Sequence, residues 1–140
     1  MKETLVPGLA GELRFTVPVG KTVPHLYPES DGFAAMPEVL ATGFMVGLVE
    51  WACIDLIAPH LDEGEMSLGV HVDLSHDAAT PPGLEVTVRV RLEEVDGRRL
   101  TFSAEADDGV DRICAGRHQR FVVDRARFDA GVARKAPGPA

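Results

Sequence analysis

The stretch that decides the fold covers residues 43–58 and runs Gly-Phe-Met-Val-Gly-Leu-Val-Glu-Trp-Ala-Cys-Ile-Asp-Leu-Ile-Ala. Its apolar residues fall on every side of a helical projection, and the alternation typical of strands does not fit it. A helix that is apolar on all sides is a buried helix. We expect Thr42 to be its N-cap and Pro59 to end it.

The segments on both sides of this helix carry strand patterns. Residues 13–18 alternate, and residues 19–41 form an irregular, proline-rich segment that we expect to be an ordered loop or a short lid. Four later segments alternate with a period of two, at residues 67–76, 84–95, 99–107 and 111–123. Asp96-Gly97 and Asp108-Gly109 are hairpin signals. In the first of the four segments, one face is expected to hold Leu68, Val70, Val72, Leu74 and His76.

One apolar helix followed by an antiparallel sheet predicts the α+β class and the hot-dog fold, in which the sheet wraps around the helix. The 140 residues form a single domain, 1–140, and we expect the small, polar tail after about residue 129 to be frayed. Because one wrapped sheet cannot cover every side of the helix, a second copy is expected to help bury it. The sequence therefore predicts a homodimer.

Charge and cysteine content exclude several classes of protein. The 14 Lys+Arg against 22 Asp+Glu give a net charge of -8, which argues against a nucleic-acid or anionic-membrane partner. The N-terminus has no signal-peptide core, and the apolar helix, interrupted by Glu50 and Asp55, is too short to span a bilayer. We expect a cytoplasmic protein. The two cysteines, Cys53 and Cys114, form no Cys-x-x-Cys motif and suggest neither a zinc site nor a redox pair.

Three residues are candidates for chemistry. Glu50 is a lone carboxylate in an apolar helix, and it either acts in a site or reaches solvent from a helix edge. His76 continues the predicted inner face of its strand, where it is a proton-transfer group or a histidine satisfied by a carbonyl. Thr42 is either a plain N-cap or part of the site. It lies eight residues from Glu50, or ~12 Å along a helix, so the two meet only through a fold-back or across a dimer.

Other signals carry no site. His71-x-Asp73-x-x-His76 has the spacing of a metal motif, but in a strand His76 points away from the other two, so we expect no metal and no other cofactor. Cys53 and Cys114 are expected to be small buried apolar residues rather than nucleophiles.

At these residues the chain resembles the fluoroacetyl-CoA thioesterase family of hot-dog proteins. The resemblance covers most of the chain, and its most specific motifs are His25-Leu26-Tyr27-Pro28-Glu29-Ser30 and Glu50-Trp51-Ala52-Cys53. It implies a catalytic set of Thr42, Glu50 and His76. It also implies a backbone role near the thioester for Gly69 and a polar role in the acyl pocket for Arg120. The family has two phenylalanines in an apolar lid; this chain has Phe33 and Met36 at those positions.

The resemblance thus implies an acyl-CoA substrate, most closely fluoroacetyl-CoA or an analogue, hydrolysed to the acid and CoA. The residue types suit that reaction, since a thioester needs a nucleophile or activated water, a base and hydrogen-bond donors. Glu50 attacks directly or activates water, and the sequence leaves both open. Two other functions also stay open: a hydratase or dehydratase acting on acyl thioesters, and a non-catalytic acyl-CoA-binding module. Met36 is flexible, so we expect the lid to admit more varied acyl groups than two aromatic rings would.

Overall fold

The structure is a computed structural model that describes residues 1–138. The strands in this part of the chain are β1 Ala10–Thr16, β2 Glu65–Leu74, β3 Glu85–Asp96, β4 Arg99–Asp107 and β5 Arg112–Asp124. The α-helices are α1 Asp31–Ala34, α2 Thr42–Ile57 and α3 Arg125–Lys135. Three short 3-10 helices complete it: η1 Val19–Lys21, η2 Val23–His25 and η3 Ala58–His60.

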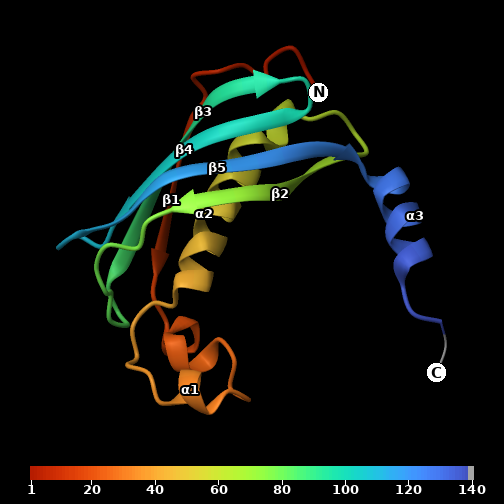
Figure 1. Cartoon of the computed structure of the whole chain (residues 1–140). Helices are drawn as coiled ribbons and strands as arrows, with labels where there is room; N and C mark the ends of the chain where they lie inside the picture. Colours follow the sequence, from red (N-terminus) through yellow and green to blue (C-terminus); the bar gives the residue numbers. More distant parts are fainter. Residues whose placement is uncertain (139–140) are drawn as a thin grey trace.

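The five strands form one antiparallel sheet in the order β1-β3-β4-β5-β2, and this sheet curls around α2 (Figure 1). The predicted hot-dog fold is therefore confirmed. Both predicted hairpins are present, and each has its glycine at positive φ, +58° at Gly97 and +85° at Gly109, where a residue without a Cβ is favoured. β2 lies at one edge of the sheet and closes the curved wall beside α2.

The core lies between one side of α2 and the concave face of the sheet. Met45, Val49 and Cys53 are fully buried on the helix and pack into a cluster with side chains such as Leu92 and Phe102. Fully burying a side chain of this size contributes about 1.5–3 kcal/mol. The helix is nevertheless buried on one side only within a single chain, because Trp51 is 45% exposed and Ile54 is 44% exposed.

β2 differs from the predicted alternation because its register shifts between Gly69 and His71. Directly opposed residues in an antiparallel pair share a face, so the buried residues of β5 reveal the inner face of β2. The opposed pairs are Ser67 with Val122, Gly69 with Arg120, and Val72 with His118. The inner face thus holds Ser67 and Gly69 before the bulge and Val72 and Leu74 after it. The prediction that Leu68 and Val70 share that face was wrong, since one extra residue reverses the alternation.

The stretch before α2 and the chain after β5 contain short helices that the sequence did not predict. The irregular stretch before α2 contains η1, η2 and α1, and the Ser30 side chain caps α1 by accepting a hydrogen bond from the Phe33 N–H (3.2 Å). The chain after β5 forms α3, whose N-cap is Asp124. The sequence predicts instead that the chain is frayed after about residue 129. α3 projects from the end of β5 and has no buried side chain (Figure 1). The last two residues of the expected frayed tail, Pro139 and Ala140, lie outside the described residues.

Among residues 1–138, one helical stretch, Thr42–His60, is long and apolar enough to cross a membrane by length and composition. The stretch is longer than the 16 residues 43–58 because η3 follows α2 directly, which brings its length to 19 residues. In the structure the same stretch is the core helix around which the sheet is wrapped.

Candidate active site

Thr42 and His76 meet at the N-terminal end of α2. Ala41, not Thr42, is the N-cap residue, so the predicted capping role of Thr42 was wrong. The Thr42 side chain is instead hydrogen bonded to His76, with Oγ1 and Nδ1 2.8 Å apart. His76 lies just after the end of β2 and not within the strand, where the sequence predicted it. It still contacts the helix that the sequence predicted it would face.

The second ring nitrogen of His76 is free to act on a ligand. Nε2 is buried and has no hydrogen-bond partner within the described chain. Burial lowers the pKa of His76 below its usual value near 6.5, and the nearby Asp77 carboxylate opposes this in part. The imidazole is therefore neutral at pH 7, the form that can take up or deliver a proton through Nε2.

Glu50 belongs to a second cluster, farther along α2. Its Oε2 accepts a hydrogen bond from Arg120 Nη1 on β5 at 2.9 Å. The Glu50 side chain is 38% exposed and that of Arg120 is 3% exposed, so the ion pair lies at the border between core and solvent. The sequence presented Glu50 as an unpaired carboxylate; in the structure its partner is Arg120, from a strand 70 residues away.

Gly69 is the third member of the Glu50 cluster. A Cβ built on Gly69 would lie 2.7 Å from Glu50 Oε2 and 3.4 Å from Arg120 Nη1. A Cβ at Gly69 would displace the Glu50 carboxylate from this position, so glycine lets the β2 backbone pass beside it. Gly69 is solvent-accessible within one chain, so the backbone beside Glu50 is open to a ligand.

Sequence reasoning missed two residues that support this cluster. His118 on β5 is fully buried, with Nδ1 2.8 Å from the His71 carbonyl oxygen and Nε2 3.2 Å from Arg120 Nη1. Ser67 on β2 accepts hydrogen bonds from Arg120 at its hydroxyl and its carbonyl oxygen. The sequence carried one usable signal, a histidine two residues from Arg120 on the same strand face, but the bulge that completes the contact has no sequence signature.

The structure does not join the two clusters within one chain. Thr42 begins α2 and Glu50 lies eight residues later, a rise of about 12 Å. The lid segment is also apart from Glu50, because α1 lies beyond the N-terminal end of α2 and packs against η2 (Figure 1). Phe33 contacts the Tyr27 ring, with centroids 5.6 Å apart, and Met36 is 53% exposed.

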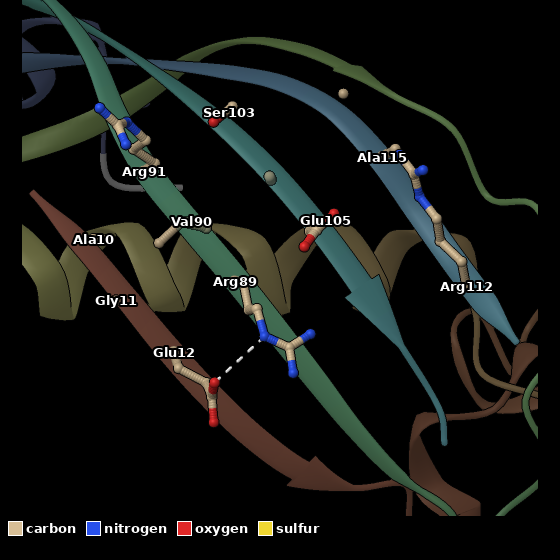
Figure 2. A pocket seen from close by; sticks show the side chains of 12 residues that line it. Ala10, Gly11, Glu12, Arg89, Val90, Arg91, Ser103, Glu105, Arg112 and Ala115 are labelled. Carbon is tan, nitrogen blue, oxygen red and sulfur yellow. Dashed lines mark ion pairs between the residues drawn. The ribbon is translucent and has the colours of Figure 1, made fainter. Parts of the chain in front are cut away.

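Neither cysteine is a competing nucleophile, and the outer face of the sheet has a cavity of its own. Burial raises the pKa of Cys53 to about 12 and that of Cys114 to about 11, so neither thiol is ionised at neutral pH. A broad cavity of about 760 Å³ lies on the outer face of β1, β3, β4 and β5, with α2 behind the sheet (Figure 2). Arg89 in this cavity is ion-paired with Glu12, as Figure 2 shows.

A sheet wrapped around one helix is the hot-dog arrangement, and here that helix supplies a carboxylate while the chain after β2 supplies a histidine. Comparison with known proteins gives the family. The profile of the family described as "Fluoroacetyl-CoA-specific thioesterase" matches residues 24–126. This chain belongs to that family.

Individual relatives agree with this membership. The chain is 56% identical over 123 residues to a fluoroacetyl-CoA thioesterase of Streptantibioticus cattleyicolor, covering 88% of each protein. A solved structure of the fluoroacetyl-CoA thioesterase FlK superposes with a TM-score of 0.94 at 52% identity, covering 96% of this chain and all of that one. A variant of FlK in complex with fluoroacetate and CoA gives a TM-score of 0.87 at 53% identity, over 89% and 99% of the two chains.

Proposed function

We propose that this thioesterase hydrolyses fluoroacetyl-CoA or a closely similar short acyl-CoA to the free acid and CoA. The observation that carries the proposal is the Glu50 cluster. Arg120 holds one carboxylate oxygen, Oε2, beside the open strand at Gly69. One relative is named a fluoroacetyl-CoA thioesterase and is 56% identical over 123 residues, and a solved structure in complex with fluoroacetate and CoA is 53% identical over 89% of this chain.

Each member of the proposed catalytic set has a distinct task. Glu50 attacks the thioester carbonyl carbon, or removes a proton from the water that attacks it. The C–S bond breaks and CoA leaves as the thiolate. The neutral His76 ring takes up the proton that the attacking water releases, directly or by way of Glu50, and passes it to the thiolate. Where Glu50 attacks directly, water then hydrolyses the anhydride and restores the Glu50 carboxylate. Thr42 fixes the orientation of that ring through the 2.8 Å hydrogen bond to Nδ1. Gly69 has no side chain of its own, so its backbone can approach a thioester bound beside Glu50.

The separation of the clusters supports a shared site in a homodimer. Thr42 and His76 of one protomer would face Glu50 of its partner, since about 12 Å of helix separates them within one chain. The exposed side of α2, with Trp51 and Ile54, and the open edge of β2 together offer an apolar surface for that contact. Closing this surface would also remove water from the acyl pocket.

The acyl pocket would be completed by Phe33 and Met36 of the lid segment, residues 30–37. Met36 is exposed and has three rotatable bonds, so it can follow acyl groups of different shape. We therefore propose that the preference for fluoroacetyl-CoA over acetyl-CoA is smaller here than with two aromatic rings in the lid. One methylene in an apolar pocket distinguishes substrates by only about 1–3 kcal/mol.

We also propose a cytoplasmic location. Acyl-CoA thioesters are intracellular metabolites, and the two cysteines of this chain are buried free thiols. Persistence of free thiols fits a reducing compartment.

A thiol-release assay tests the proposed function. The purified protein is mixed in turn with fluoroacetyl-, acetyl-, propionyl- and phenylacetyl-CoA, and free CoA thiol is measured with a chromogenic disulfide. We expect the highest kcat/KM with fluoroacetyl-CoA. Release of no thiol from any substrate, with tight binding, would identify a binding module. An α,β-unsaturated and a β-hydroxy acyl-CoA are assayed alongside, and gain or loss of water in either without thiol release would identify a hydratase or dehydratase.

A further inference from the structure

His118 has one tautomer that satisfies its surroundings. Nδ1 lies 2.8 Å from the His71 carbonyl oxygen, which can only accept a hydrogen bond, so Nδ1 carries the proton. Nε2 therefore presents a lone pair, and Arg120 Nη1 lies 3.2 Å from it. A guanidinium can only donate, so the ring accepts from Arg120. His118 is fully buried, which leaves water no role in this choice.

Arg120 is held on three sides by protein atoms. Nε donates to Ser67 Oγ at 2.8 Å, Nη2 donates to the Ser67 carbonyl oxygen at 2.9 Å, and Nη1 is shared between His118 Nε2 and Glu50 Oε2. The planar fork of the guanidinium has little freedom once these contacts are made. The position of Glu50 Oε2 is therefore determined by atoms from two strands.

The bulge in β2 brings the His71 carbonyl to His118. The register shift places one extra residue, Val70, between Gly69 and His71, directly beside the carbonyl that accepts from the ring. A Cβ on Gly69 would lie 3.3 Å from His118 Cε1, so this strand also packs tightly against the ring. Bulges occur next to active sites, where they redirect groups that a regular strand would place elsewhere.

We propose that His118 is a positioning residue for hydrolysis: its neutral, Nδ1-protonated ring accepts from Arg120 and so fixes the guanidinium that orients Glu50. This proposal rests on the proposed function, because it assumes that Glu50 carries the reaction. His118 itself does not touch the thioester. Its effect is to hold Glu50 Oε2 in place so that Oε1 is presented to the substrate.

The charge state of His118 follows from its neighbours on three elements. An imidazolium would turn an Nε2–H toward Arg120, and two donors would then face each other. Burial lowers the pKa of His118 most, the Arg120 cation and the His71 ring lower it further, and the hydrogen bond to His71 O and the Glu50 carboxylate oppose this. The ring is therefore neutral at pH 7, and the support of Arg120 is lost only below the ordinary histidine range, as the pH falls through the lowered pKa.

The kinetic test compares three variants with fluoroacetyl-CoA as substrate. His118→Phe keeps a ring but removes the acceptor, and we expect kcat to fall by up to about 100-fold with KM nearly unchanged, as for a misplaced catalytic group. His118→Gln offers an amide oxygen to Arg120 and should recover most of the lost kcat. The matched control is His60→Phe, on η3, whose ring contacts Thr4 away from the site and which should retain full activity.

A spectroscopic measurement tests the same geometry without turnover. Long-range 1H–15N spectra of the histidine rings, with His118 assigned from its variants, should show a neutral ring protonated at Nδ1 at pH 7. An Nε2-protonated ring or an imidazolium would overturn the proposal even if His118→Phe does not fold. A folded His118→Phe with wild-type kcat, or with only KM changed, would overturn it as well. Absence of hydrolysis by the wild type would instead overturn the proposed function.

Discussion

At the residue scale, Glu50 differs most from its prediction. The sequence presents it as a costly, unpaired charge, but in the structure it has a partner. Arg120, itself almost fully buried, neutralises the carboxylate, and each group would be expensive to leave alone. The pair thus has a structural effect as well as a proposed catalytic one. The two effects can be separated by a substitution that keeps the shape and removes the charge.

Glu50→Gln is expected to abolish turnover while the protein stays folded. The amide oxygen can still accept from Arg120, so the free energy of unfolding should fall by less than about 3 kcal/mol. Thiol release and urea denaturation are measured on the same preparation. Retained turnover would remove Glu50 from the mechanism, and loss of the fold together with turnover would make its role structural.

His76→Ala is expected to lower kcat by roughly 10²–10⁴ with little change in KM, because the ring moves protons rather than binding the substrate. The variant should also change stability at low pH. Since the folded pKa of His76 is lowered, the unfolded chain binds the proton first as the pH falls below about 6.5. Stability of the wild type declines there, and the alanine variant should decline less. A change in KM alone would assign His76 to binding.

Met36→Phe is expected to widen the preference for fluoroacetyl-CoA over acetyl-CoA, because a rigid ring adapts less to a different acyl group. The difference should amount to a factor of roughly 10–100 in the ratio of kcat/KM values, the range that a small change in an apolar pocket provides. Competition between the two substrates measures it. An unchanged ratio would place selectivity in Thr42, Glu50 and His76 instead of the lid.

At the element scale, the pairing of β2 with β5 places the Glu50 cluster. β2 supplies Gly69, Ser67 and the His71 carbonyl, while β5 supplies Arg120 and His118. Because β2 is an edge strand, β5 alone holds it to the sheet. Gly116 on β5 faces Leu74 in this pairing, so we expect it to matter for the site as well as for the fold.

Gly116→Ala is expected to destabilise this pairing. Gly116 has φ +151°, and a Cβ there would lie 2.0 Å from the Asp73 carbonyl oxygen, a backbone atom that cannot turn aside. We expect a loss of at least about 2 kcal/mol in unfolding free energy, together with lower activity. Gly20→Ala is the matched control, since nothing lies within 4 Å of its built Cβ. Equal denaturation midpoints for the two variants would contradict the prediction.

At the scale of the whole molecule, the proposed homodimer accounts for apolar surface that a single chain leaves open. Trp51 and Ile54 on α2 and Val70 and Val72 on β2 are each more than two-fifths exposed. Exposed apolar side chains on α2 and on the edge strand are surface that a second copy would cover. A second copy would also bring Thr42 and His76 toward Glu50.

Ile54→Lys is expected to convert the proposed dimer to a monomer and to abolish turnover, because a lysine buried in the proposed interface would have no partner. Val110→Lys is the control: Val110 is 77% exposed in the turn between β4 and β5, and this change should leave both properties intact. Sedimentation velocity at micromolar protein measures the assembly. A wild-type monomer that is fully active would refute the shared site.

The amino-acid sequence by itself determined the wrapped helix, the hairpins and the family, because these depend on local periodicity, turn residues and extended motifs. It also indicated that Thr42, Glu50 and His76 are candidates for chemistry. Only the tertiary structure decided that Glu50 pairs with Arg120, that Thr42 bonds His76 instead of capping its helix, and that His118 supports the pair. The reason is that these contacts join residues 34 to 70 positions apart, or depend on a bulge that reverses the alternation of β2. The tertiary structure also decided that the chain after β5 forms the helix α3. Asp124 can act as the N-cap of that helix because β5 ends at this residue.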